Sequence, residues 1–332
     1  MRGIEFYNLD KDKIVDEIRS LEPIKLAFHS DADGLASACL IASIFKVRED
    51  SDYPFSPEIF GDYMDSNLAV DLGSPIDHYD GIVIDHHPDH PDNPDYKLVL
   101  GNVPTGVVIF ELFKDLIPDD KIWLVCLSAC GDGQPEVIPE EVWIRSPYLW
   151  EMQGKIYRDQ YRRVRTYPYP IFSKISSPIN SMCRMGDVMG AYKLLRSAKS
   201  VRDVINNPVA IRAVKKIDEE VKRIFSTSDP PIIEQVKHVA IVQIESEYSI
   251  AGRIATELYN SEPYLTFVVI NTKHREVSVR GILTKYITDR LSEKGYIAGG
   301  HAGYGGVSLL DEDHQPLEVF LNHLREIART PF

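Results

Sequence analysis

The sequence has few cysteines, no long apolar run and no excess of basic residues. The four cysteines, Cys39, Cys126, Cys130 and Cys183, form no CxxC pair. This argues against a disulfide framework or a structural zinc site and favours buried thiols in a reducing compartment. No apolar run reaches the roughly 18 residues of a membrane span, and residues 1–10 are not a signal peptide. We therefore predict a cytoplasmic protein without a membrane partner.

Basic side chains are also scarce relative to acidic ones. Lys and Arg number 37 against 50 Asp and Glu, a formal net charge of −13, which argues against a wide surface for long duplex nucleic acid. Short nucleotides remain compatible, because bound divalent metals invert the local field. The sequence contains no GxxxxGK[ST] motif, which argues against nucleotide-driven work.

Short apolar segments alternate with helical patterns in the first part of the chain, which favours a parallel sheet covered by helices, and thus an α/β fold. A proline-rich, mainly helical stretch follows, and the alternation resumes near the end. We predict strands at 24–28, 68–70, 81–84, 236–244, 265–270 and 276–281. The predicted domains are 1–134, a helical connector at 135–231, and a smaller α/β domain at 232–332.

The most informative stretch is His29-Ser-Asp31-Ala-Asp33-Gly34. It lies between the apolar segments 24–28 and 35–45, a context that predicts strand, loop and helix. His29, Asp31 and Asp33 would then project from one loop at the carboxyl end of a strand, where ligands bind in open α/β sheets. Taken alone, the stretch could also be a solvated loop.

An aspartate and two adjacent histidines follow another predicted strand as Asp85-His86-His87. Neighbouring histidines point in different directions, so one can bind a metal while the other meets the substrate or donates a proton. Asp85 can orient a histidine through the other ring nitrogen. A surface loop rich in histidine is the alternative, and we expect His78 and His90 to be peripheral.

Two further aspartates complete a candidate metal site. Asp71 ends a short strand beside a glycine, and Asp132 lies between glycines after an apolar helical run. Each alone could be a turn or helix cap. Mostly carboxylate ligands with some imidazole suit Mn²⁺ or Mg²⁺ better than structural zinc. The set is large enough for two metals with one bridging carboxylate: His29, Asp31, Asp33, Asp71, His86 and Asp132.

A second group of candidate residues lies downstream. Ser278 and Arg280 share one face of an alternating strand, and arginine can form a bidentate contact with phosphate. Gly299, Gly300 and His301 begin a glycine-rich run that we predict to be a flexible loop with backbone N–H groups exposed to an anion.

In this order the motifs resemble the DHH phosphoesterase family, with a DHH-associated domain at the carboxyl end. RecJ-type exonucleases, nanoRNases and cyclic dinucleotide phosphodiesterases belong to it. The resemblance covers both ends of the chain but not residues 135–235. It implies an active site in an interdomain cleft, with two Mn²⁺ ions for which Mg²⁺ or Co²⁺ can substitute.

The resemblance also implies a role for each matching residue. Asp71 would bridge one ion on His29 and Asp31 and a second on Asp33, His86 and Asp132. His87 would contact the scissile phosphate and Asp85 would support it. A distal phosphate or nucleotide end would be held by Ser278, Arg280, Gly299, Gly300 and His301.

The function predicted from these residues is Mn²⁺-dependent hydrolysis of phosphodiesters in short oligonucleotides or dinucleotides, by a monomer or homodimer. One alternative is a single-strand-specific exonuclease, for which Tyr and Arg residues between 157 and 169 offer a basic, aromatic track. A solvated helix face followed by a loop is the other interpretation of that segment. A small phosphate or polyphosphate hydrolase and a non-catalytic replication scaffold also remain. Tyr304 departs from the small residues of relatives and either stacks on a base or fills space.

Overall fold

The computed structural model describes residues 3–51, 53–150, 152–158, 164–170, 174–226, 232–301, 303–309 and 313–330. The chain forms two compact units. The first comprises Met1–Cys183 and Asp187–Val214, and the second Arg184–Gly186 and Lys215–Phe332. The predicted connector contributes residues to both units, and the predicted division at 134 and 231 stays a prediction. In the described part of the chain, no helix is long and apolar enough to cross a membrane.

The first unit contains a five-stranded sheet in the order β1-β5-β4-β3-β2. Strands β2 to β5 are parallel, and β1 pairs with β5 in the antiparallel direction. The predicted parallel sheet is therefore confirmed, although the sequence patterns did not identify β1 or β5. The strands are β1 (Ile4–Tyr7), β2 (Leu26–Phe28), β3 (Leu68–Val70), β4 (Ile82–Asp85) and β5 (Lys97–Gly101).

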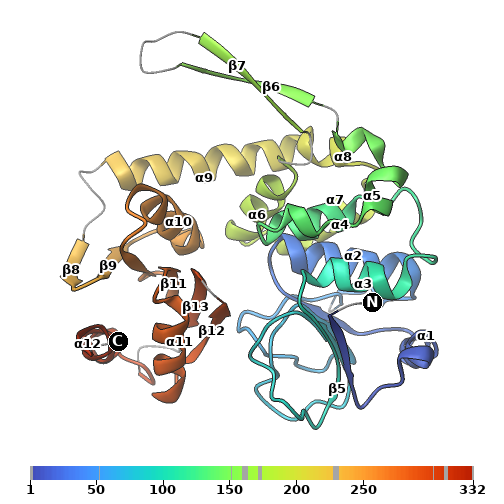
Figure 1. Ribbon diagram of the computed structural model, residues 1–332, viewed down its shortest axis with the longest axis horizontal. Coiled ribbons are helices and arrows are strands. Elements are labelled where there is room, and N and C mark those ends of the chain that lie inside the picture. The colour runs from blue at the N-terminus through green and yellow to red at the C-terminus, as the bar shows by residue number, and fades with distance from the viewer. Residues whose placement is uncertain are drawn as a thin grey trace. The chain divides into compact units, whose positions relative to one another are not determined.

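Helices cover one face of this sheet. Helices α2 (Ala32–Ile44) and α3 (Thr105–Phe113) contact the strands, and α4 (Leu124–Gly131) packs on both helices (Figure 1). The opposite face is covered by aromatic side chains of an irregular segment, including Tyr63 and Tyr79. These rings bury the apolar surface that a second helical layer covers in a doubly wound fold.

The remaining helices of the first part of the chain are short. They are α1 (Ile14–Arg19), α5 (Glu140–Arg145), α6 (Ser176–Arg184), α7 (Val188–Ser197), α8 (Val201–Ile205) and the 3-10 helices η1 (Lys11–Lys13), η2 (Pro135–Val137) and η3 (Pro147–Trp150). Helix α9 (Pro208–Ser226) begins in the first unit and ends in the second. The side-chain oxygen of Asn207 accepts a hydrogen bond from the N–H of Val209 at 2.9 Å and so caps the first turn of α9.

The connector also contains an antiparallel hairpin, which the sequence analysis did not predict. Strands β6 (Met152–Arg158) and β7 (Val164–Pro170) pair along their whole length. The predicted helix face at the start of the Tyr and Arg track is therefore wrong for the described residues. Alternation of basic and aromatic residues with a period of two, as in Arg165, Tyr167 and Tyr169, is a strand pattern. Tyr161, Arg162 and Arg163 lie outside the described residues.

The second unit contains a six-stranded sheet in the order β12-β13-β11-β10-β9-β8. Only the pair β9 and β10 is parallel. The single strand predicted at 236–244 is two strands, because the chain turns at Lys237 with a φ of 52°. The strands are β8 (Ile232–Val236), β9 (Val239–Ile244), β10 (Thr266–Asn271), β11 (Glu276–Gly281), β12 (Ile297–His301) and β13 (Gly303–Ser308).

The faces of the second sheet carry different helices. Helix α10 (Ala251–Ser261) packs on one face together with the end of α9. Helices α11 (Thr284–Glu293) and α12 (Leu317–Arg329) pack on the other. The glycine-rich run is not the predicted flexible loop, because it forms β12 and β13. A Cβ atom on Gly305 would lie 2.7 Å from Cγ2 of Thr284, so glycine allows α11 to approach the strand.

Candidate metal centre

The first ligand candidates lie where β2 passes into α2. Asp31 is the N-cap of α2, and its Oδ1 accepts the N–H of Gly34 at 3.0 Å. A Cβ atom on Gly34 would lie 2.2 Å from the carbonyl oxygen of His29, so this close turn requires glycine. Asp33 belongs to the first turn of the helix and is fully buried. Of the three residues, only His29 and Asp31 therefore precede the helix, so the prediction that all three project from one loop is wrong for Asp33.

Asp71 follows β3 in an unusual backbone conformation. Its φ of 62° is in the left-handed region, which costs a non-glycine residue about 1–3 kcal/mol. Its N–H donates to the carbonyl of Ile84 at 3.1 Å, and only 1% of the residue is exposed. A strained, buried aspartate at a strand end is a common feature of functional sites.

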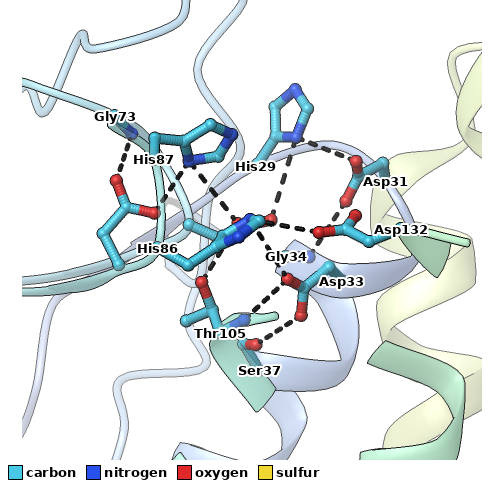
Figure 2. Close-up of polar contacts among 12 residues, drawn as sticks. His29, Asp31, Asp33, Gly34, Ser37, Gly73, His86, His87, Thr105 and Asp132 are labelled. Atoms are coloured by element: carbon cyan, nitrogen blue, oxygen red, sulfur yellow. Dashed lines mark hydrogen bonds and ion pairs between the residues drawn. The ribbon is translucent and has the colours of Figure 1, made fainter. Parts of the chain in front are cut away.

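The six predicted ligands, Asp71 included, form two adjacent groups. Figure 2 labels the other five, His29, Asp31, Asp33, His86 and Asp132. Within each group the candidate ligand atoms lie within 4.8 Å of one another. One group is His29, Asp31 and Asp71, and the other is Asp33, His86 and Asp132, with Asp71 also in contact with His86. The structure thus brings together all the residues that the sequence predicted as metal ligands.

The two carboxylate oxygens of Asp71 face different groups. Oδ2 lies 3.9 Å from Nδ1 of His29, and Oδ1 lies 3.3 Å from Nε2 of His86. Nδ1 of His29 is also 3.1 Å from Asp31, and Nε2 of His86 is 3.1 Å from Asp132. A carboxylate with one oxygen directed at each group has the arrangement that a bridging ligand needs.

Asp132 tests whether these residues suit a cation. It caps the C-terminus of α4, and its Oδ2 is buried without a hydrogen-bond partner in the described structure. The contact with His86 is short enough for an ion pair but lacks hydrogen-bond geometry. An orphaned, buried carboxylate oxygen is costly unless a cation satisfies it. The residues present therefore fit a hard divalent metal ion.

Asp33 and Asp71 are held by groups that the sequence analysis missed. The backbone N–H groups of Thr105 and Gly106 donate to the two oxygens of Asp33 at 2.8 and 3.1 Å. The Thr105 hydroxyl donates to Oδ1 of Asp71 at 3.1 Å, and the Ser37 hydroxyl donates to Asp33 at 3.1 Å. The N-terminus of α3 therefore orients two ligands from other elements.

Asp85 is in contact with His87, and its role in supporting that ring stays a prediction. Its Oδ1 contacts Nδ1 of His87 at 2.8 Å, and its Oδ2 accepts the N–H of Gly73 at 2.8 Å. The prediction that His90 is peripheral is wrong. Its side chain is fully buried, with Nε2 at 2.7 Å from Asp85 and Nδ1 at 2.7 Å from the Tyr96 hydroxyl. The contact between His90 and Asp85 could not be predicted from residue spacing, because it depends on how the turn between these two residues folds back.

The other expected peripheral histidine is exposed. The His78 side chain is 68% exposed and contacts Asp80 at 2.8 Å. It belongs to none of the groups described above.

The carboxylates raise the pKa of the neighbouring histidines. Burial opposes the charged form of His86, but Asp132 and Asp71 outweigh it and raise its pKa to about 12. For His29 and His87 burial is similarly outweighed, by Asp31 and Asp85 respectively, and each pKa rises to about 9. The histidines thus take up positive charge where carboxylates are crowded.

The carboxylates themselves respond in opposite directions. Burial, followed by the charges of Asp71 and Asp132, raises the pKa of Asp33. Burial also raises the pKa of Asp71. Burial is outweighed for Asp85 by His87 and His90, which hold its pKa well below the usual range. The charged forms of Asp33 and Asp71 are therefore disfavoured in the absence of a cation, and a divalent cation bound between the two groups would stabilise them.

The predicted substrate residues lie in the second unit and are described by themselves. Ser278 and Arg280 are in β11, and the other predicted residues, Gly299, Gly300 and His301, are in β12. Arg280 is largely buried, and Nη1 donates to the carbonyls of Val279 and Gly305 at 2.8 and 3.1 Å. Burial lowers the pKa of its guanidinium to about 10. Roles for these residues remain proposals.

Several solved structures share this fold. The structure of RecJ from Thermus thermophilus with Mn²⁺ has a TM-score of 0.65 at 16% identity, over 97% of this chain and 54% of that one. This chain thus spans about half the length of that protein. A structure titled exonuclease RecJ bound to manganese has a TM-score of 0.59 at 17% identity, covering 97% and 94% of the two chains.

A third similar structure is CDC45 from Entamoeba histolytica, with a TM-score of 0.54 at 8% identity, over 96% of this chain and 99% of that one. No known family profile matches the sequence, and neither does any curated protein. The fold of this chain is similar to the two-domain α/β fold of RecJ, which confirms the predicted resemblance at the level of fold alone.

Proposed function

We propose that the chain is a phosphoesterase that uses two Mn²⁺ ions to hydrolyse phosphodiester bonds in short oligonucleotides or dinucleotides. The observation that carries this proposal is Asp71, whose two oxygens face two separate ligand groups. One ion would be held by His29, Asp31 and Asp71, and the other by Asp33, Asp71, His86 and Asp132. Mg²⁺ or Co²⁺ would fit the same oxygen-rich ligands.

Two bound divalent cations supply charge that polarises phosphoryl oxygens and makes water nucleophilic near neutral pH. The chain's own contribution is to position the reacting groups. Asp85 holds the Nδ1 atom of His87, which directs the Nε2 atom toward the phosphate being cleaved. The His87 side chain is 17% exposed, so the ring can meet a substrate. Asp85 also fixes the tautomer of the ring.

The substrate class follows from charge and from the second unit. A net charge of −13 disfavours a long polyanion, whereas one or two phosphates can be bound locally. Ser278 and Arg280 would hold a phosphate distant from the cleaved bond, and Gly299, Gly300 and His301 would contact the same nucleotide end. We also propose a cytoplasmic location, which the low cysteine content of the sequence supports.

A single-strand exonuclease is the second candidate, and the β6 and β7 hairpin favours it. The register pairs Lys155 with Tyr167, Tyr157 with Arg165, and Gln153 with Tyr169. Basic and aromatic residues that alternate along a segment are typical of regions that follow a single strand of nucleic acid. The likeness to RecJ is compatible with this candidate.

The test is a Mn²⁺ activity panel on the full chain. It compares di- to pentaribonucleotides, cyclic dinucleotides, long single-stranded DNA and pyrophosphate. The proposal predicts that the shortest ribonucleotides or dinucleotides are hydrolysed fastest. Fastest cleavage of the long strand would support the exonuclease, and fastest cleavage of pyrophosphate would support a small phosphate hydrolase.

Two variants distinguish the loss of a metal ligand from the effect of removing any carboxylate from the chain. Asp71→Asn removes the formal negative charge at the bridging position and should nearly abolish turnover. Asp80→Asn is the matched control, because its side chain is 94% exposed and lies outside the ligand groups. Undiminished activity of Asp71→Asn with unchanged metal content would overturn the two-metal proposal. Inactivity of the wild-type chain on every substrate would favour the scaffold.

A further inference from the structure

The predicted substrate residues of the second unit fall into two neighbouring rows across three strands. In one row Arg280 of β11 pairs with Tyr304 of β13, which pairs with His301 of β12. In the adjacent row Ser278 pairs with Gly306, and Gly306 pairs with Gly299. Partners in a row belong to the same face of a sheet, as do residues two apart on a strand. Both rows therefore belong to one face.

The buried residues show which face this is. Val277 and Val279 alternate with Ser278 and Arg280 and are buried on the side of α11 and α12. The two rows consequently belong to the face on which α10 packs. Gly252 at the start of α10 agrees with this, because a Cβ atom there would lie 3.4 Å from Nη2 of Arg280 and 3.5 Å from Oγ of Ser278.

The glycines divide between the two faces. Gly305 is opposite Gly300 in the register, and a Cβ atom on Gly305 would meet α11, so this pair serves helix packing. Gly299 and Gly306 belong to the face with Arg280. Among the described residues, no atom lies within 4 Å of the position that a Cβ atom on Gly299 would take, so the backbone there faces open space. The sheet face at Gly299, beside Ser278 and Arg280, is therefore accessible to a ligand.

Arg280 and Tyr304 form a stacked pair on the same face of the sheet. The guanidinium carbon lies 4.7 Å from the centroid of the Tyr304 ring. The Nε atom of Arg280 is buried without a hydrogen-bond partner in the described residues. The charge of Arg184 also acts on Arg280, so positive charge accumulates here. Half of Tyr304 remains exposed, at 50%.

We propose that Tyr304 is a specificity residue that stacks on the nucleobase of a nucleotide whose phosphate is bound by Arg280 and Ser278. This inference rests on the proposed function and narrows it to nucleotides rather than bare phosphates. An orphaned guanidinium N–H and a hydroxyl provide donors for the phosphate. An aromatic ring with an exposed surface next to that site suits the base, and such stacking tolerates any base.

The test compares two ligands that differ only in the base. AMP and ribose 5-phosphate are titrated calorimetrically into the full chain in EDTA, so that no metal-dependent turnover occurs. Stacking should make AMP bind roughly 5- to 100-fold more tightly than ribose 5-phosphate in the wild type. Tyr304→Ala should bring this ratio close to unity without changing the affinity for ribose 5-phosphate. Tyr304→Phe should retain the ratio, because it keeps the ring.

Tyr264→Ala is the matched control, since Tyr264 is also an exposed tyrosine of the second unit, at 65%. It should leave both affinities unchanged. Equal affinities for the two ligands in the wild type, or an unchanged ratio in Tyr304→Ala, would overturn the proposal. Absence of binding by both ligands would overturn it as well. Because the assay involves no hydrolysis, its result is independent of whether Asp71 supports turnover.

Discussion

Thr105 is not a candidate ligand but holds two of the candidate ligands in place, and this positioning role can be tested. The side chain is fully buried, and its hydroxyl donates to Oδ1 of Asp71 at 3.1 Å. Its backbone N–H holds Asp33 independently of the side chain. Thr105→Val has nearly the same shape and retains the backbone contact, so the substitution removes one hydrogen bond to a carboxylate.

The magnitude follows from that single contact. A hydrogen bond to a charged group contributes about 1.5–3 kcal/mol. Removing a group that orients a metal ligand typically lowers metal affinity by roughly 10- to 100-fold. We expect Thr105→Val to weaken Mn²⁺ binding by about this factor. Thr105→Ser retains the hydroxyl and should stay within about 3-fold of the wild type, although it loses a methyl group that contributes about 0.8 kcal/mol to folding.

The assay is calorimetric titration of Mn²⁺ into the metal-free chain, with urea unfolding in EDTA measured in parallel. Thr288→Val is the control, because Thr288 is a buried threonine of the second unit whose hydroxyl bonds to helix carbonyls. It should leave Mn²⁺ affinity unchanged. Wild-type affinity in a folded Thr105→Val chain, or an equal loss in Thr105→Ser, would refute the reasoning.

Two further predictions concern packing and positioning. His90→Phe removes the buried partner of Asp85 and should lower the free energy of unfolding by about 3–5 kcal/mol in thermal or urea unfolding. His90→Gln keeps a hydrogen-bond donor and should recover part of this loss. Equal stability of the two variants would contradict the prediction. Gly305→Ala would place a Cβ atom 2.7 Å from Thr284 and should cost about 1–3 kcal/mol of unfolding free energy, whereas Gly299→Ala meets open space and should cost less than about 0.5 kcal/mol. Similar urea midpoints for the two glycine variants would be evidence against the packing explanation.

The convergence of the candidate ligands could be predicted from the sequence because these residues lie next to short apolar elements. Asp71 and His86 follow β3 and β4, and Asp33 lies in the first turn of α2. The carboxyl ends of parallel strands meet at one edge of a sheet, so residues far apart in sequence converge there. Strand order and side-chain chemistry were sufficient for this inference.

The supporting residues could not be predicted in the same way. Thr105 opens α3 after β5, and this strand was not recognised because its five residues carry too short a pattern. His90 reaches Asp85 through the path of a turn, which residue spacing does not determine. The glycine-rich run was misassigned because glycine suits a flexible loop as well as a strand that a helix approaches closely.

The central claim is that two divalent cations share Asp71 in the first unit. Crystals grown with Mn²⁺ and measured at the manganese absorption edge test it most directly, because anomalous peaks locate the ions without reference to activity. We expect two peaks roughly 3.5–4 Å apart. One should contact His29 and Asp31, the other Asp33, His86 and Asp132, and both should contact Asp71. A single peak, or two peaks that do not share Asp71, would contradict the account.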